Sequence, residues 1–428
     1  MTRSVLILSP HFPPSMLAGV HRARHLARHL PVHGWRPIVV RAHERCYVEP
    51  GDPDLAALVP ANLEQVRTGA LPARLCRLAG VGDIGLRAWP YLRRAIDRLI
   101  VTEQPSAVLI TGSPFYPMLL TRGITRRFGV PVVLDFQDPW VAHQGAAYAV
   151  GTKAWAAHSL AVALEPSAVR HAAFVTSVSD VQNEDMSSRY PWLDRERTAA
   201  IPIGVDPDDF AALRDRSVAV GETQFDPALV NFNYIGSYWP RAAPSICRVF
   251  TALALLRKES PSLASRLRLN FVGTDPTPGS AGVRKVLPLA VAAGVGDLVS
   301  EFPQRLPYLQ ALGLLAHSDV LLLIGSDEPH YTASKIYPAL MSGRPYLSLF
   351  HQASSAHKVL VAAGGGCAIA FRDAGHLDGS IPALVEALRA LAISPAAFGY
   401  PSLEAIEPYT ARTVAGQFAE VFDRVSRP

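Results

Sequence analysis

The sequence predicts an α/β protein of two Rossmann-like domains, each built on a doubly wound parallel sheet, that face each other across a cleft. Three observations lead to this prediction. The 428 residues exceed the usual length of about 100–200 residues for one domain. Short β-branched apolar runs alternate with longer segments of helical periodicity. The alternation stops once, where Asp, Pro and Gly accumulate over residues 206–227, and then restarts.

The first series of apolar runs fills the N-terminal half. Its predicted strands are residues 4–8, 37–40, 107–111, 131–135, 174–177 and 199–203. Helical periodicity between them predicts helices over residues 20–30, 89–103 and 116–128. Residues 42–85 fit the alternation poorly and offer one possible strand, at 64–68. Such a long segment is either a solvated insertion or a lip that faces an acceptor or a membrane.

The second series repeats the pattern. Its predicted strands are residues 230–235, 267–272, 298–302, 320–324, 345–350 and 367–371, each followed by a helical segment. A last helix is predicted from about residue 410 to 425. Right-handed crossovers between such strands place ligands at the carboxyl ends of each sheet.

Composition and charge narrow the class of partner. Hydrophobic residues make up 49% of the chain, which is enough apolar material for packed interiors. The net charge of +5 is too small to indicate a nucleic-acid-binding protein. It favours acidic partners such as nucleotide phosphates or anionic lipid. Four scattered cysteines without a C-x-x-C pair predict neither a disulfide framework nor a zinc site.

Targeting signals are not evident in the sequence. The apolar run from Val5 to Leu8 is too short for the core of a signal peptide. No window approaches 18 uninterrupted apolar residues. We therefore expect a cytoplasmic protein, either free or in peripheral contact with the inner face of a membrane.

A strand, a proline-rich loop and a glycine at a helix entrance open the sequence at residues 6–20. Gly19 lets the backbone approach a ligand, and the next N–H groups suit a donor phosphate or a carboxylate; the alternative is a plain turn. The following helix carries the basic residues His21, Arg22, Arg24, His25, Arg28 and His29. They form either a solvated basic face or a surface attracted to an anionic membrane by about 1 kcal/mol each.

Several segments, taken in order, carry a resemblance to a known family. They are the opening at residues 6–20, the segments 111–115 (Thr-Gly-Ser-Pro-Phe) and 133–140 (ending Asp-Pro-Trp), the segment 201–210 (Ile-Pro-Ile-Gly-Val-Asp to Phe), and the segments 234–236, 270–273, 334–337 and 342–345. This set covers nearly the whole chain, and it resembles glycosyltransferase family four, the retaining GT-B enzymes, in its Asp-Pro-Trp subgroup.

The resemblance implies different roles for the two domains. It implies GT-B architecture, with an acceptor-binding domain at residues 1–205, a nucleotide-sugar-binding domain at 206–404, and a final helix at about 405–428 that packs back on the first domain. The implied reaction moves a sugar from a nucleoside diphosphate sugar to a glycan, a lipid-linked or a small-molecule acceptor with retention. No obligatory metal or other cofactor is implied.

Two departures from the family pattern concern the donor. Members place an Arg and a Lys on the pyrophosphate after the first strand of the second domain. Here Ser237 and Ala242 stand at those positions, and Arg241 fits with an offset of one residue. Two glutamates eight residues apart are replaced by His330 and Pro338, although Asp327 and Glu328 lie nearby. These departures keep open a catalytically silent scaffold; a nucleotide-sugar epimerase or hydrolase would need a pair of carboxylates.

Lys335 is the strongest single candidate for donor binding. A loop that enters a helix at Ser334 presents the Lys335 ammonium, and backbone N–H groups up to Ile336, to a diphosphate. The alternative is a solvated lysine. Phe302 and Pro303, at another strand end, suit either a wall for the nucleobase or core packing.

Carboxylates at a strand end are the candidates for catalysis. Asp138 ranks first and Asp135 second, because either carboxylate at this edge can orient a sugar hydroxyl or accept its proton. A helix-capping role is the alternative for both. His143 and His11 are further candidates, because an imidazole titrates near neutral pH.

Overall fold

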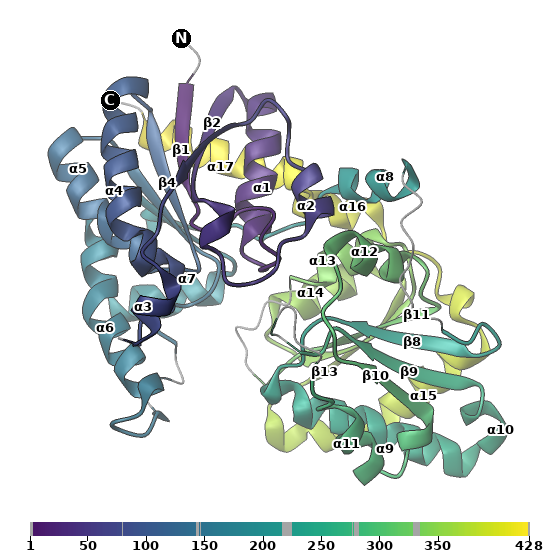
Figure 1. Ribbon diagram of the computed structural model, residues 1–428. Helices are drawn as coiled ribbons and strands as arrows, with labels where there is room; N and C mark the ends of the chain where they lie inside the picture. The colour runs from purple at the N-terminus through teal and green to yellow at the C-terminus, as the bar shows by residue number, and fades with distance from the viewer. Residues whose placement is uncertain are drawn as a thin grey trace. The chain divides into compact units, whose positions relative to one another are not determined.

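The computed structural model describes residues 3–78, 80–142, 145, 147–215, 225–275, 277, 282–327 and 334–426. The chain divides into two compact units (Figure 1). Unit 1 comprises Met1–Ile203 with Ala411–Pro428, and unit 2 comprises Gly204–Thr410. Each unit is an α/β layered structure around one parallel sheet, so the predicted fold class is confirmed.

Unit 1 contains a seven-stranded sheet in the order β3-β2-β1-β4-β5-β6-β7. The strands are β1 Arg3–Leu8, β2 Trp35–Ala42, β3 Glu64–Thr68, β4 Ala107–Gly112, β5 Val132–Phe136, β6 Phe174–Ser177 and β7 Thr198–Ala200. The helices are α1 Val20–His29, α2 Pro53–Ala57, α3 Ala73–Leu78, α4 Ile84–Glu103, α5 Thr121–Phe128, α6 Lys153–His171, α7 Asp180–Arg189 and α17 Ala411–Val425. Strand order reverses between β1 and β4, which makes the carboxyl ends of these strands the expected ligand site.

Both faces of the unit 1 sheet are covered. On β1, Leu6 and Leu8 belong to one apolar cluster, whereas Val5 and Ile7 belong to another, because successive strand residues point to opposite faces. The second cluster includes Phe418 of α17, so the last helix of the chain packs with α1 on this face. Burial on both faces explains why the strands appear in the sequence as continuous apolar runs.

Unit 2 contains a six-stranded sheet in the order β10-β9-β8-β11-β12-β13. The strands are β8 Val230–Ile235, β9 Leu267–Val272, β10 Val299–Phe302, β11 Val320–Ile324, β12 Tyr346–His351 and β13 Gly366–Phe371. The helices are α8 Pro207–Asp215, α9 Ala243–Glu259, α10 Pro261–Ala264, α11 Leu287–Ala292, α12 Tyr308–Ala316, α13 Ile336–Met341, α14 Ser355–Ala363, α15 Ile381–Ile393 and α16 Leu403–Ile406. The order reverses here between β8 and β11.

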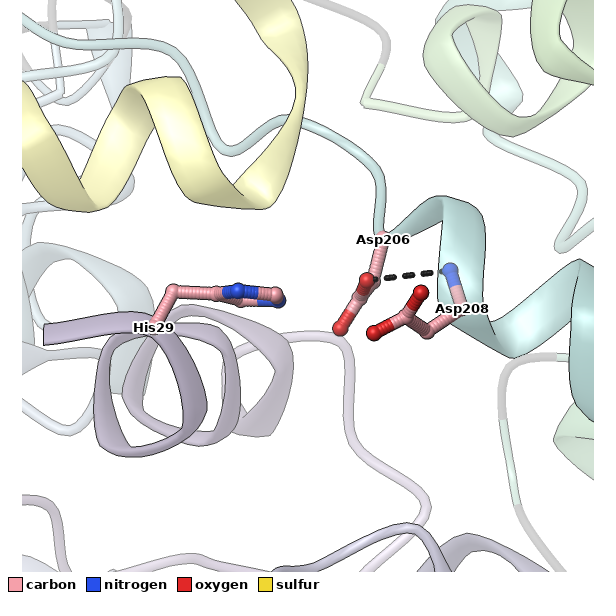
Figure 2. Close-up of side chains that lie close together, drawn as sticks. All are labelled: His29, Asp206 and Asp208. Atoms are coloured by element: carbon pink, nitrogen blue, oxygen red, sulfur yellow. Dashed lines mark hydrogen bonds between the residues drawn. The ribbon is translucent and has the colours of Figure 1, made fainter. Parts of the chain in front are cut away.

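Helix α8 occupies the start of the segment in which the sequence pattern breaks. The Asp206 carboxylate accepts a hydrogen bond of 3.1 Å from the backbone N–H of Asp208 and so satisfies one free donor of the first turn (Figure 2). The Tyr308 hydroxyl donates to Asp209 Oδ2 at 2.7 Å, which ties α8 to α12 within unit 2.

The sequence misplaces several element boundaries. Residues 116–128, predicted as one helix, form a short 3-10 helix over Tyr116–Leu120 followed by α5. Helix α4 begins at Ile84, five residues before the predicted start, because the Asp83 carboxylate caps the N–H of Leu86 at 3.0 Å. Segment 42–85 holds α2, β3 and α3, and its one possible strand, 64–68, is confirmed as β3. Within the described residues, no helix is long and apolar enough to cross a membrane.

Candidate functional site

The switch point of unit 2 opens between β8 and β11. Strand β8 pairs with β9 over six residues, from Val230 to Ile235, but with β11 over two, Phe232 and Asn233. The carboxyl ends of β8 and β11 are therefore not joined by ladder hydrogen bonds. In doubly wound folds this crevice is where ligands bind.

Lys335 lies in this crevice. It directly precedes α13, and its Nζ donates a hydrogen bond of 2.7 Å to the Tyr234 hydroxyl at the end of β8. The ammonium also lies 4.2 Å from the centroid of the Tyr234 ring, within the range of a cation–π contact. The Tyr234 hydroxyl in turn donates to the Ser237 carbonyl at 2.9 Å. Burial raises the pKa of Tyr234, so this hydroxyl stays neutral and can both donate and accept.

A glycine makes room for Lys335. Gly236 has φ +144°, a conformation that residues with side chains rarely adopt, and a Cβ built on it would lie 3.2 Å from Lys335 Nζ. The predicted segment 234–236 therefore has two physical tasks: Tyr234 binds the ammonium, and Gly236 leaves the space that the ammonium fills.

A second cation stands at the same edge of unit 2. Arg241 follows β8, and its Nε and terminal nitrogen each lie 2.9 Å from Oδ1 of Asp327, just after β11. This pair joins the two loops that border the crevice. Asp327, considered for the nucleotide ribose, is thus bound to Arg241, and Glu328 and His330 lie outside the described residues.

The other predicted donor residues fall in different places. Ile336 is fully buried, while Ser334 is partly buried beside Lys335. Phe302 ends β10 and Pro303 follows it, and β9 lies between this outer strand and β8. Phe302 is partly exposed and meets Phe225 edge-on at 6.5 Å between centroids. The structure therefore brings Ser334, Lys335 and Ser237 together around Tyr234, with Arg241 on the loop after β8, and Phe302 and Pro303 are not part of that group.

Unit 1 has a polar network at the corresponding edge. Asp135, in β5, is fully buried and accepts hydrogen bonds from Thr111 Oγ1 at 2.7 Å, Thr176 Oγ1 at 2.9 Å and Arg22 Nε at 3.2 Å. A carboxylate with this many internal donors holds neighbouring strands together. This placement favours a positioning role for Asp135 over contact with an acceptor.

Gly19 belongs to the same network. The Gln137 amide bridges from Thr111 Oγ1, at 2.7 Å, to the Gly19 carbonyl, at 3.1 Å. A Cβ on Gly19 would lie 3.3 Å from the Ser113 carbonyl, so the loops after β1 and β4 approach closely at this glycine. The network fixes the entrance of α1 relative to β4 and β5.

Some of the basic residues of helix α1 are buried and do not face solvent. Arg22 and Arg24 are fully buried and His25 nearly so. The Arg22 guanidinium donates to the Pro202 and Ile201 carbonyls at 2.6 and 2.7 Å, besides Asp135. The prediction of a solvated or membrane-facing basic surface is therefore wrong for these three residues, because all three are buried, Arg22 among groups from distant parts of the chain.

Asp138 lies at an exposed position where the chain leaves β5, but desolvation of its carboxyl raises the pKa of that group. Within the described part of the chain, no hydrogen bond or ion pair involves its side chain, so it is available to a ligand. The neighbouring Trp140 stacks on Phe115 at 5.6 Å between centroids and meets Tyr116 edge-on at 5.9 Å, which fixes the loop. His143 lies outside the described residues.

His11, after β1, has partners that the sequence does not reveal. Its Nδ1 lies 3.1 Å from Glu49 Oε1, and the Ser15 hydroxyl donates to the same carboxylate oxygen at 2.7 Å. Burial raises the pKa of Glu49, but the hydrogen bonds and charge of His11 and the bond from Ser15 outweigh it and lower this pKa to about 2. Glu49 lies more than thirty residues away along the chain, and no sequence signal links it to His11.

Comparisons with known proteins agree with this geometry. Residues 18–204 match the family model described as a glycosyl transferase 4-like domain. The D-inositol 3-phosphate glycosyltransferase of Geodermatophilus obscurus is 30% identical over 110 residues, which cover 26% of this chain and 24% of that relative. The chain therefore aligns with about a quarter of the curated relative's length.

Solved structures match over almost the whole chain. HepE of Anabaena, in complex with UDP and glucose, aligns with 99% of this chain and 100% of its own, at 15% identity and a TM-score of 0.58. WaaG, a glycosyltransferase involved in lipopolysaccharide biosynthesis, aligns with 99% of this chain and 98% of its own, at 16% identity and a TM-score of 0.55.

The two parallel sheets and their structural neighbours define a GT-B glycosyltransferase fold. Residues 18–204 are similar to the glycosyl transferase 4-like domain, which confirms the resemblance to glycosyltransferase family four.

Proposed function

We propose that this protein is a glycosyltransferase that moves a sugar from a nucleoside diphosphate sugar to a glycan, lipid-linked or small-molecule acceptor, with retention of configuration. The observation that carries the proposal is Lys335, held by Tyr234 and accommodated by Gly236 at the switch point of unit 2. HepE is described in complex with UDP and glucose, which makes a UDP-hexose the first donor to test.

Unit 2 supplies the donor site in this proposal. The Lys335 ammonium binds the diphosphate and stabilises the negative charge that develops on it as the glycosidic bond breaks. Because Tyr234 already orients the ammonium, little ordering is left for the moment of reaction. Arg241, positioned by Asp327, adds positive charge at the same edge. With both cations serving the leaving group, the proposed reaction needs no metal ion.

Unit 1 supplies the acceptor site. Asp138 lies beside the Trp140 loop with its carboxyl pKa raised by desolvation, and it orients the acceptor hydroxyl or accepts its proton. Asp135 and the Gln137 bridge keep the strand ends in place beneath it. The catalytic group is thus separate from the buried carboxylate that positions it.

A thermal-shift screen tests the proposal directly. The protein is heated with UDP, GDP, CDP, ADP or dTDP and with their common sugar conjugates, because a ligand of the folded state raises stability by mass action. We expect a saturable shift for one base, and release of that nucleoside diphosphate when its sugar conjugate is incubated with the protein. No shift with any nucleotide would reject the donor site and favour a catalytically silent scaffold.

A further inference from the structure

Helix α3 in unit 1 exposes leucines on one face. Leu75 is 65% and Leu78 87% exposed, and Leu71, four residues before Leu75, is also exposed. Residues three apart lie on the same side of a helix, so Leu75 and Leu78 form one apolar face of α3 directed to solvent, and Leu71 is exposed just before the helix. A leucine as exposed as Leu78 leaves most of its apolar surface in water. This exposure is unfavourable in free energy, and contact with a partner removes it.

The first half of α6, also in unit 1, is a second exposed apolar surface. Trp155, Leu160 and Val162 are exposed along this helix, and Val150 is exposed just before it. Ala156 and Ala157 are exposed as well. Several large apolar side chains exposed on one short stretch of helix are typical of protein or membrane contacts.

Both segments are free of negative charge. The sequence contains no Asp or Glu over residues 65–82 or over residues 139–164. Exposed basic side chains accompany the apolar ones: Arg74 and Arg77 on α3, and Lys153 at the start of α6. Apolar side chains beside cations, with no carboxylate between them, are complementary to a surface that is apolar inside and negative outside.

The two segments lie at the edge of unit 1 that carries Asp138. Helix α3 follows the carboxyl end of β3, and α6 follows the carboxyl end of β5 after the Asp138 loop. Figure 1 shows α3 and the first half of α6 beyond the carboxyl ends of the unit 1 strands. The exposed surfaces therefore share an edge with the candidate acceptor site.

We propose that α3 and the first half of α6 form a docking surface for an anionic lipid bilayer. The exposed leucines and Trp155 enter the headgroup region, and Arg74, Arg77 and Lys153 bind lipid phosphates. In this proposal the membrane contact is this surface and not helix α1, because the buried arginines of α1 cannot reach lipid. Docking does not depend on the proposed sugar transfer, but if both hold, a lipid-linked acceptor would be presented at the edge that carries Asp138.

Vesicle sedimentation without any sugar donor tests the docking surface. The full-length protein is mixed with vesicles of phosphatidylcholine alone and with vesicles that contain one third phosphatidylglycerol. We expect binding to the anionic vesicles that weakens with added salt, and little binding to the neutral ones. At about fivefold per basic residue, Arg74→Gln with Arg77→Gln is expected to weaken the binding about 25-fold.

Leu75→Glu with Leu78→Glu is expected to abolish binding. Val101→Glu is the matched control, because Val101 is 65% exposed like Leu75 but lies near the C-terminal end of α4, away from the carboxyl edge of the sheet. Equal loss in the control, binding that survives both α3 variants, or equal binding to neutral vesicles would each overturn the proposal. So would a stable oligomer in solution that Leu75→Glu dissociates, since a second copy would then cover the face.

Discussion

Replacing Gly236 by alanine tests whether the geometry around Lys335 serves a ligand. The new Cβ would lie 3.2 Å from Lys335 Nζ and 3.5 Å from its Cε, so the ammonium must shift slightly from its place on Tyr234. The backbone at φ +144° adds a strain of about 1–3 kcal/mol. At about 3 °C per kcal/mol for a unit of this size, melting is expected to fall by roughly 3–9 °C.

Nucleotide binding is the informative readout for this variant. Shifting the ammonium weakens a charge-assisted hydrogen bond to phosphate whose complete loss would cost about 1.5–3 kcal/mol, so we expect nucleoside diphosphate binding to weaken by up to about 100-fold. Isothermal titration calorimetry well below the melting temperature measures this loss.

Gly343→Ala is the control for backbone strain. Gly343 also lies in unit 2 with a positive φ of +72°, and a Cβ there meets nothing closer than Tyr400 at 3.9 Å. It is expected to lower the melting temperature comparably and to leave nucleotide binding unchanged. Equal nucleotide affinity in both variants would refute the assignment of the Lys335 environment to a phosphate site.

Three further predictions concern the acceptor edge, pH and metals. Asp138→Asn is expected to reduce sugar transfer at least 100-fold while nucleoside diphosphate affinity stays within twofold, as measured by product formation and calorimetry. Glu49 has its pKa lowered from 4.5 to about 2, so the stability that its ionised form adds is complete above pH 4.5 and lost as pH falls toward 2. The melting difference between wild type and Glu49→Gln should follow that course, and a difference constant down to pH 2 would contradict it. EDTA is expected to leave transfer unchanged, and a loss restored by Mg²⁺ would show that Lys335 and Arg241 are insufficient.

The strands could be predicted from the sequence because each is a local apolar run. In β1, every residue from Val5 to Leu8 is fully buried, so the strand appears in the sequence as a short continuous apolar run. Helix boundaries that depend on a single hydrogen bond were harder to predict from the sequence. The start of α4 depends on the Asp83 cap, and the carboxylate of Asp83 is one of many acidic groups in the chain.

The candidate site was predictable where one residue type and its position carry the chemistry. Lys335 stands out because lysine is scarce and because it precedes a helix after a strand, but its partner Tyr234 is 101 residues away. The sequence places Asp135 and Asp138 equally at a strand end. Only the structure separates them, because burial of Asp135 depends on Arg22 and on two strands that are distant in the sequence.

The basic helix α1 shows the limit of reasoning from one segment. Its composition suggests a charged surface, yet Arg22 is fully buried against Asp135 and the carbonyls of Ile201 and Pro202. Buried guanidinium groups are stable when all their donors are used, and no local pattern reveals partners more than a hundred residues away.

The most direct test of the central claim is calorimetric titration of a nucleoside diphosphate, UDP first, into three proteins: wild type, Lys335→Ala and Lys258→Ala. Lys258 is exposed near the end of α9 in the same unit, so its replacement removes the same charge away from the strand ends. We predict saturable binding to wild type and Lys258→Ala, and binding at least tenfold weaker to Lys335→Ala. Binding of equal strength to all three proteins would contradict the claim that Lys335 holds the diphosphate.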